Sequence, residues 1–151
     1  MRWSHQGIVA TMALKSLVLF SLLVLVLLVL EGAQAASVQD FQRKHLDPRI
    51  GPFSRNYCTQ MMRNRKLSGR VFNTFVHQTL AAVQAVCREP NIPCKNTKNN
   101  CHRSPYRMRI TDCILTRHRP IITYTSRHRS AYIVVACFGK PPMPVHFDGS
   151  R

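Results

Sequence analysis

Residues 133–148 read IVVACFGKPPMPVHFD, a stretch that combines an apolar run with a histidine two residues before a carboxylate. Its apolar start is typical of a buried strand, and a proline-rich segment leads from there to Val145-His146-Phe147-Asp148. Alternate side chains of an extended segment lie on one side, so His146 and Asp148 share a face. A carboxylate there can hold an imidazole in one tautomer and leave the other ring nitrogen free for proton transfer. The pattern indicates an acid–base site, and a purely structural pair is the alternative.

The first 35 residues have the composition of a secretory signal peptide. Lys15 precedes an apolar run at 17–30 that is short for a membrane span, and Ala33-Gln34-Ala35 resembles a cleavage site. We therefore predict that residues 1–35 are removed, that the protein is secreted, and that residues 36–151 form one small domain. A signal anchor that stays in the membrane is the alternative.

All six cysteines follow the predicted cleavage site. An even number in a secreted chain indicates three disulfides, which add stability to a domain of this size. No Cys-x2-Cys pair is present, which argues against a zinc site, and no metal or cofactor is expected. The cysteines are Cys58, Cys87, Cys94, Cys101, Cys113 and Cys137.

The chain is strongly basic, with 22 Lys and Arg residues, 6 Asp and Glu residues and a formal net charge of +16. Without Arg2, Lys15 and Glu31 of the predicted signal peptide, 20 basic and 5 acidic residues remain, a net charge of +15. Such an imbalance predicts a polyanionic partner, which could be nucleic acid, an anionic membrane or a heparin-like glycan. Charge alone does not choose among them.

Composition and periodicity predict an α+β domain, in which short helices precede a set of antiparallel strands. Helices are expected at 37–47, which starts with a capping-box-like sequence, and at 57–66 and 79–87. Strands are expected at 71–77, 106–115, 121–125 and 131–138, with a polar turn at 126–130.

Seven motifs then occur in a recognisable order. They are Phe41-Gln-Arg-Lys-His45-Leu-Asp47, Tyr57-Cys-Thr-Gln-Met-Met62, Asn73-Thr-Phe-Val-His77, Val83-Gln-Ala-Val-Cys87, Cys94-Lys-Asn…Asn100-Cys101, Ile110-Thr-Asp-Cys113 and Pro144-Val-His-Phe-Asp148. Together they resemble the secreted ribonuclease A family, nearest the pancreatic type, over essentially all of residues 36–151. The resemblance implies three helices on a curved antiparallel sheet, and we expect the protein to be a monomer. It also implies the pairings Cys58–Cys113, Cys87–Cys137 and Cys94–Cys101.

The resemblance implies metal-independent cleavage of RNA by transphosphorylation. A general base removes the proton of the 2′-hydroxyl, which attacks the adjacent phosphorus, and a general acid protonates the leaving 5′-oxygen. The product is a 2′,3′-cyclic phosphate. By motif, His45 is the expected base, His146 the expected acid and Asp148 the residue that orients His146. His77 matches a structural position and is not assigned to the site.

Substrate contacts are implied in the same way. Thr74 is expected to bind a pyrimidine edge through its backbone and hydroxyl group, with Phe147 beside the base. Four more substrate contacts are expected. Asn100 and Lys98 are expected to contact the base on the far side, and Lys44 and Lys95 are expected to contact phosphates. For each of these residues the alternative is a solvated loop position.

The sequence departs from the family pattern in two segments. The family normally has a Cys-Lys pair shortly before Asn-Thr-Phe, and this lysine stabilises the phosphorane. Gly69 and Arg70 stand there instead, in a shortened segment. Ile122 stands where the partner of that cysteine falls, so both halves of one disulfide are absent together. A misplaced cation slows catalysis, so Arg70 predicts attenuated activity.

The sequence therefore predicts a secreted, pyrimidine-preferring endoribonuclease of attenuated activity. The alternative is a cationic protein of the same fold that acts in host defence, as an antimicrobial, or binds cell surfaces with little or no catalysis. For this alternative an exposed basic surface is expected, with two loop tips and three further arginines: Arg117-His118-Arg119, Arg127-His128-Arg129, Arg103, Arg107 and Arg109.

Overall fold

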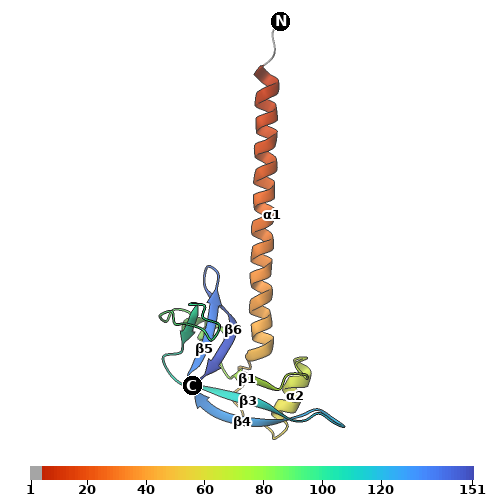
Figure 1. Cartoon of the computed structure of the whole chain (residues 1–151), viewed down its shortest axis with the longest axis vertical. Coiled ribbons are helices and arrows are strands. Elements are labelled where there is room, and N and C mark those ends of the chain that lie inside the picture. The colour runs from red at the N-terminus through yellow and green to blue at the C-terminus, as the bar shows by residue number, and fades with distance from the viewer. Residues whose placement is uncertain (1–4) are drawn as a thin grey trace. The chain divides into compact units, whose positions relative to one another are not determined.

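The computed structural model describes residues 5–151, and the chain divides into two compact units at the boundary between Ala36 and Ser37. Helix α1, His5–His45, passes from the first unit into the second (Figure 1). Its apolar part is long enough to cross a membrane by length and composition, a property that signal sequences share. The cleavage after residue 35 and the domain 36–151 remain predictions.

The prediction that a helix starts at Ser37 is wrong for the uncleaved chain. Helix α1 is already continuous there, because the leucine-rich segment before it favours helix and contains no proline. The capping-box sequence therefore caps no helix start. The end of the helix at His45, shortly before Pro48, agrees with the prediction.

Two short helices complete the helical part of the second unit, α2, Tyr57–Asn64, and α3, Leu80–Val86. Helix α2 buries Cys58, Met61 and Met62 along one face, at the spacing of a helix turn. Helix α3 begins where the Thr79 hydroxyl accepts a hydrogen bond from the Ala82 N–H at 3.2 Å. Both helices lie where the sequence predicts them, within two residues at either end.

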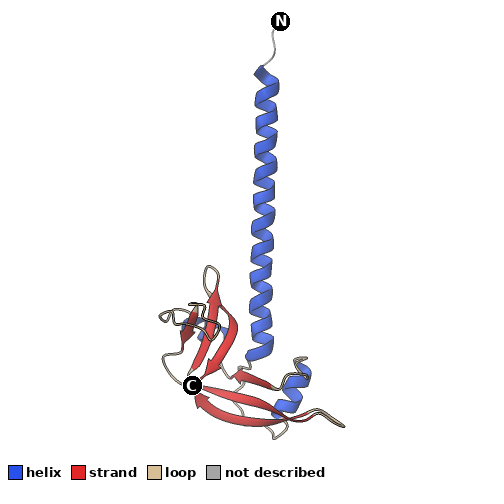
Figure 2. Ribbon diagram, in the orientation of Figure 1, coloured by secondary structure: helices blue, strands red, loops and turns tan. Residues whose placement is uncertain are grey.

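Within residues 37–151, six strands form two antiparallel sheets, shown in red in Figure 2. The first sheet has the order β1-β3-β4, with β1 at Phe72–Val76, β3 at Met108–Arg117 and β4 at Thr123–Ala131. The second has the order β2-β5-β6, with β2 at Cys101–Arg103, β5 at Ile133–Phe138 and β6 at Met143–Ser150. The predicted α+β class with three helices and antiparallel sheets is confirmed.

The predicted polar turn at residues 126–130 is wrong. This segment lies inside strand β4 and pairs with β3, with Arg127 opposite Asp112 and Arg129 opposite Ile110. The Asp112 carboxylate accepts hydrogen bonds from both arginines, which places this polar sequence on a strand. A distant carboxylate leaves no signal in the local sequence, so turn propensity misled the prediction.

The hydrophobic core packs the second unit around the last turns of α1. Phe41 lies in one cluster with Val83 of α3, Ile110 of β3 and Ile133 and Val135 of β5. A second cluster packs α2 against the first sheet. The apolar start of the stretch at 133–148 is buried as predicted, and it fixes strand β6, which pairs with β5 along its length.

Three disulfides cross-link this unit, and the pairings are those that the resemblance implies. Their Cα atoms are 5.3 Å apart in Cys58–Cys113, 5.8 Å in Cys87–Cys137 and 5.2 Å in Cys94–Cys101. The first joins α2 to β3, the second joins the end of α3 to β5, and the third closes a short loop.

We expect the absent fourth disulfide to be restorable. Gly69 is exposed, with open space where a Cβ would lie, and Ile122 is only partly buried. The Tyr124 hydroxyl already ties the two segments together by donating to the Arg70 carbonyl at 2.6 Å. Gly69→Cys with Ile122→Cys should therefore raise the free energy of unfolding by about 2–4 kcal/mol, measured by denaturant titration. The reduced double variant is the control, and two thiols that stay free under oxidising refolding would contradict the alignment.

Candidate active site

His45 is the last residue of α1, and its imidazole is held by two elements of the fold. Nδ1 lies 2.9 Å from the Thr74 carbonyl oxygen of β1, and the ring stacks on Phe147 of β6 with centroids 5.1 Å apart. Because a carbonyl only accepts, Nδ1 carries the proton and the neutral ring keeps its lone pair on Nε2. Burial, together with the charges of Arg70, His146 and Lys44, lowers the pKa of His45 to about 4. His45 is therefore neutral near pH 7 and can accept a proton.

His146 and Asp148 lie on the same face of β6, as the alternation of the strand predicts. The His146 Nε2 is 3.4 Å from Asp148 Oδ1, and the His146 side chain is exposed while that of Asp148 is buried. The Asp148 carboxylate also accepts the Lys95 backbone N–H at 3.2 Å. This arrangement fixes one ring nitrogen and leaves Nδ1 of His146 available for proton transfer.

The two histidines line one cleft of about 290 Å³. All four predicted catalytic residues border it, namely His45, His146, Arg70 and Asp148. Four of the six predicted substrate contacts also border it, namely Thr74, Phe147, Lys44 and Lys95. Residues from opposite ends of the chain thus meet in a cleft large enough for a nucleotide-sized ligand.

The other two predicted contacts lie outside the lining of that cleft. The Asn100 amide donates to the Cys137 carbonyl at 3.3 Å, which ties it to strand β5. Lys98 is exposed, and its backbone N–H donates to the Asn96 side chain. In the described part of the chain these two residues support the small loop rather than border the cleft.

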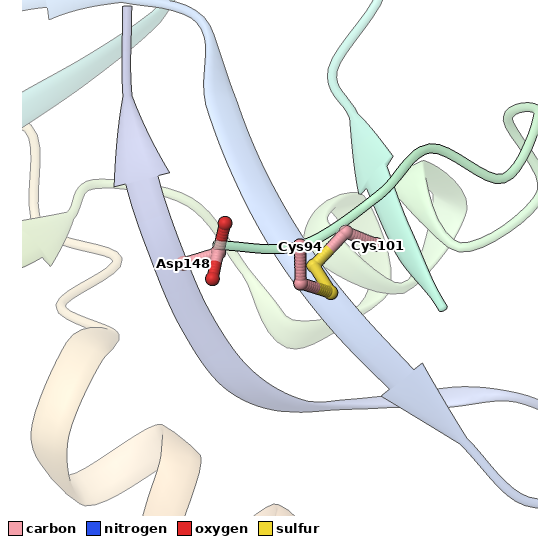
Figure 3. A group of neighbouring side chains, drawn as sticks. All are labelled: Cys94, Cys101 and Asp148. Carbon is pink, nitrogen blue, oxygen red and sulfur yellow. A yellow bond between two sulfur atoms is a disulfide. The ribbon is translucent and has the colours of Figure 1, made fainter. Parts of the chain in front are cut away.

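Figure 3 shows Asp148 beside the Cys94–Cys101 disulfide, which closes the loop that contains Lys95. The two sulfur atoms and an oxygen of the carboxylate are within 4.8 Å of one another. Both sulfur atoms are joined in the disulfide, so they are not thiolate ligands for a metal. The carboxylate instead receives the Lys95 N–H.

Arg70 is fixed at two points beside the cleft. Its Nη1 donates to Asn73 Oδ1 at 3.1 Å, and its carbonyl oxygen accepts from the Tyr124 hydroxyl. Asn73 in turn donates to the Lys44 carbonyl at 2.8 Å. The guanidinium is close enough to His45 for its charge to lower the pKa of that imidazole. A positive charge is therefore held near the candidate base.

The Thr74 hydroxyl donates to Asp112 Oδ1 at 2.9 Å. Asp112 is fully buried, and Arg127 and Arg129 each donate to its Oδ2 at 2.7 Å. Burial alone would raise the pKa of Asp112, but the hydrogen bonds from Arg129, Arg127 and Thr74 lower it. An ionised carboxylate only accepts, so Thr74 presents the lone pairs of its oxygen to a ligand.

The expectation that residues 127–129 form a loop tip is therefore wrong. Arg127 and Arg129 lie on strand β4, and both form ion pairs with Asp112. The tip at 117–119 is exposed as expected. The sequence reasoning missed Asp112 as a partner of Thr74. The motif around it is visible, but nothing local links residues so far apart in the chain.

Further cleft residues were missed. Asp40 lies four residues before Lys44 on α1, a spacing that signals a helical ion pair. Asn73 is part of the Asn-Thr-Phe motif, but its role in holding Arg70 becomes visible only in the fold. His77, which the sequence leaves out of the site, is buried and hydrogen-bonded to the Asp47 carbonyl.

Comparison with known proteins identifies the relatives of this chain. The sequence pattern of the pancreatic ribonuclease family matches residues 36–148. The chain is 45% identical to the pancreatic gamma-type ribonuclease of Rattus norvegicus over 149 residues, covering 90% of this chain and 97% of the relative. It is 46% identical to the pancreatic ribonuclease of Lemur catta over 147 residues, covering 90% and 94%. It is 45% identical to the seminal ribonuclease of Bos taurus over 150 residues, covering 92% and 99%.

The family match covers most of the folded unit and includes both cleft histidines. The matches confirm the resemblance read from the seven motifs, and the three disulfides agree with it. The family is secreted, in agreement with the apolar N-terminal segment, so the prediction of secretion is confirmed. The chain belongs to the pancreatic ribonuclease family.

Proposed function

We propose that the protein is a metal-independent endoribonuclease that cleaves RNA after pyrimidines through a 2′,3′-cyclic phosphate. The observation that carries this proposal is the pair of imidazoles facing one cleft, His45 with a free Nε2 and His146 with a free Nδ1. Two such groups can move both protons of the reaction, and the nucleophile is already part of the substrate.

In the proposed reaction His45 Nε2 takes the proton from the 2′-hydroxyl. The oxygen then attacks phosphorus, and the bond from phosphorus to the 5′-oxygen breaks. Protonated His146 gives its Nδ1 proton to that leaving oxygen, while Asp148 holds the ring by its other nitrogen. Arg70 offers a positive charge to the phosphorane, where negative charge develops.

The preference for pyrimidines rests on Thr74 and Phe147, which both border the cleft. A pyrimidine edge could accept from the Thr74 backbone N–H and meet the Thr74 hydroxyl oxygen. That oxygen has only lone pairs to offer while its hydrogen is donated to Asp112. Uracil presents an N–H at the corresponding position, so this geometry favours uracil over cytosine.

The decisive experiment is a product assay on the purified protein without its first 35 residues. A uridine-containing dinucleotide such as UpA should give a 2′,3′-cyclic phosphate in the presence of a metal chelator. Absence of the cyclic product from protein that is folded, as judged by its three disulfides, would overturn the proposal and leave the binding-protein alternative.

The pH dependence of cleavage should reflect the burial of His45. The sequence predicts both limbs of the kcat/KM profile between about pH 5 and 8. A pKa of about 4 for His45 moves the acidic limb lower, because the base is lost only as pH falls through that value. Initial rates from pH 3 to 9 with a dinucleotide test this, with circular dichroism to verify folding. An acidic limb near pH 6 would contradict the burial argument.

A second function is favoured by one surface feature outside the cleft. Arg103 and Arg107 both lie over the ring of Tyr132, with Cζ atoms 4.2 and 5.4 Å from its centroid. Both arginines are exposed, and within the described chain no carboxylate forms an ion pair with either. Guanidinium groups ordered on an aromatic ring are suited to sulfate or phosphate groups. This surface supports binding of an anionic glycan or membrane, as a host-defence or surface-binding protein requires.

We expect that surface to respond to salt and to charge removal. Arg103→Gln with Arg107→Gln should weaken heparin binding and flatten the log–log dependence of affinity on salt. The matched control is Arg55→Gln with Arg63→Gln, which removes the same charge from two exposed positions that the expected basic surface does not include. Equal losses in both double variants would show that net charge alone governs binding.

A further inference from the structure

Asp40 places a negative charge in a cleft that has to bind RNA. It borders the same cleft as His45 and His146. The other acidic residue in that lining is Asp148, which contacts His146. The two carboxylate oxygens of Asp40 instead form ion pairs with basic side chains of the same helix. A carboxylate in this position repels the phosphates of a bound RNA strand.

Asp40 belongs to a series of side-chain contacts that reaches the backbone just beyond α2. Arg43 donates to Asp40 Oδ1 at 2.8 Å and, through Nη1, to the Arg65 carbonyl at 2.6 Å, just beyond the end of α2. Lys44 Nζ lies 2.5 Å from Asp40 Oδ2. Arg43 thus fixes the carboxylate against the neighbouring helix, and the carboxylate holds the ammonium group of Lys44.

Lys44 itself is well placed to reach a phosphate. It borders the cleft, and its charge helps to lower the pKa of the adjacent His45. Its carbonyl accepts from Asn73, so the backbone is fixed and only the side chain can move. The Lys44 and Asp40 side chains are 28% and 44% exposed, and ion pairs at such positions are weak enough for a phosphate to displace.

We propose that Asp40 sets the substrate preference of this cleft by holding Lys44 away from the phosphates of longer RNA strands. The inference rests on the proposed ribonuclease function and names a residue that tunes it. A dinucleotide presents only the scissile phosphate and leaves the Asp40–Lys44 pair intact. A longer strand brings further phosphates, which must compete with Asp40 for Lys44. Each such phosphate therefore gains less binding free energy than it would from an unpaired lysine.

Acid does not release this pair in the working range of the site. Hydrogen bonds from Lys44 and Arg43 lower the pKa of Asp40 below its ordinary value. The carboxylate therefore stays ionised above its unperturbed pKa of about 3.8 and is lost only as pH falls further. Substitution is the way to test its role.

The test measures binding of thymidine oligonucleotides, which lack the 2′-hydroxyl and cannot be cleaved. Asp40→Asn keeps the side-chain shape and should lower the Kd of a tetrathymidylate by roughly two- to fivefold at low salt. The slope of log affinity against log salt should steepen by about 0.7 for one more phosphate contact. The Kd of the dinucleotide should change much less.

Two matched variants make the result decisive. Glu89→Gln removes the same charge outside the cleft lining and should leave both affinities near those of the unmodified protein. Lys44→Gln should abolish the gain from Asp40→Asn, because the gain requires the freed ammonium. The inference is overturned if Asp40→Asn matches Glu89→Gln, or if the gain persists without Lys44. Neither result depends on turnover, so failure of the ribonuclease proposal would be recognised separately by the absence of cyclic phosphate.

Discussion

Replacing either cleft histidine by alanine should lower kcat/KM for a uridine-containing dinucleotide by at least ~10²–10⁴-fold. His45→Ala removes the neutral Nε2 that faces the cleft, and His146→Ala removes the Nδ1 proton donor. The two effects should fall mainly on kcat, because proton transfer occurs in the transition state. Initial rates of cyclic phosphate formation measure both.

His77→Ala is a poor control here, because that imidazole is buried and its loss would disturb the core. His118→Ala is better matched, since His118 is exposed on the tip at 117–119 and should leave the rate unchanged. Activity that is indifferent to both cleft substitutions would reveal a contaminating nuclease and remove the basis of the enzymatic proposal.

Arg70→Ala should lower kcat by roughly a hundredfold and leave KM nearly unchanged, because the charge is needed mainly by the phosphorane. Arg70→Lys should raise kcat if the ammonium reaches the same place. A guanidinium is planar and more diffuse than an ammonium, and a displacement of about 1 Å costs about a hundredfold in rate. Steady-state kinetics with a dinucleotide separate the two parameters.

Tyr124→Phe gives the matched comparison for the position of Arg70. It removes the hydroxyl that holds the Arg70 carbonyl but leaves the charge in place. A drop in kcat similar to that of Arg70→Ala would mean that the fixed backbone matters as much as the charge. If Arg70→Ala leaves a measurable rate unaltered, Arg70 has no part in the reaction.

Much of the fold is predictable because its signals are local. Thr79 marks the start of α3, and the apolar run at 133–137 marks a buried strand. The shared face of His146 and Asp148 follows from the two-residue period of a strand alone. The family resemblance supplies the cysteine pairings, which spacing could not provide.

The remaining features depend on contacts between distant parts of the chain. In the sequence Arg127 and Arg129 suggest a polar turn, and only the fold reveals their ion pairs with Asp112. Asn100 belongs to a recognisable motif, yet its amide turns toward the Cys137 carbonyl. The low pKa of His45 is likewise a property of its burial in the folded unit, which no local pattern encodes.

The small disulfide loop links the chemistry of the cleft to the redox state of the surroundings. Cys94–Cys101 closes the loop whose Lys95 N–H is donated to the carboxylate that orients His146. Reduction of this bond would free the loop and weaken that contact, while the other two bonds still cross-link the helices to the sheets. Loss of this bond alone would therefore disturb the position of His146, the proposed general acid, while the other two cross-links remain in place.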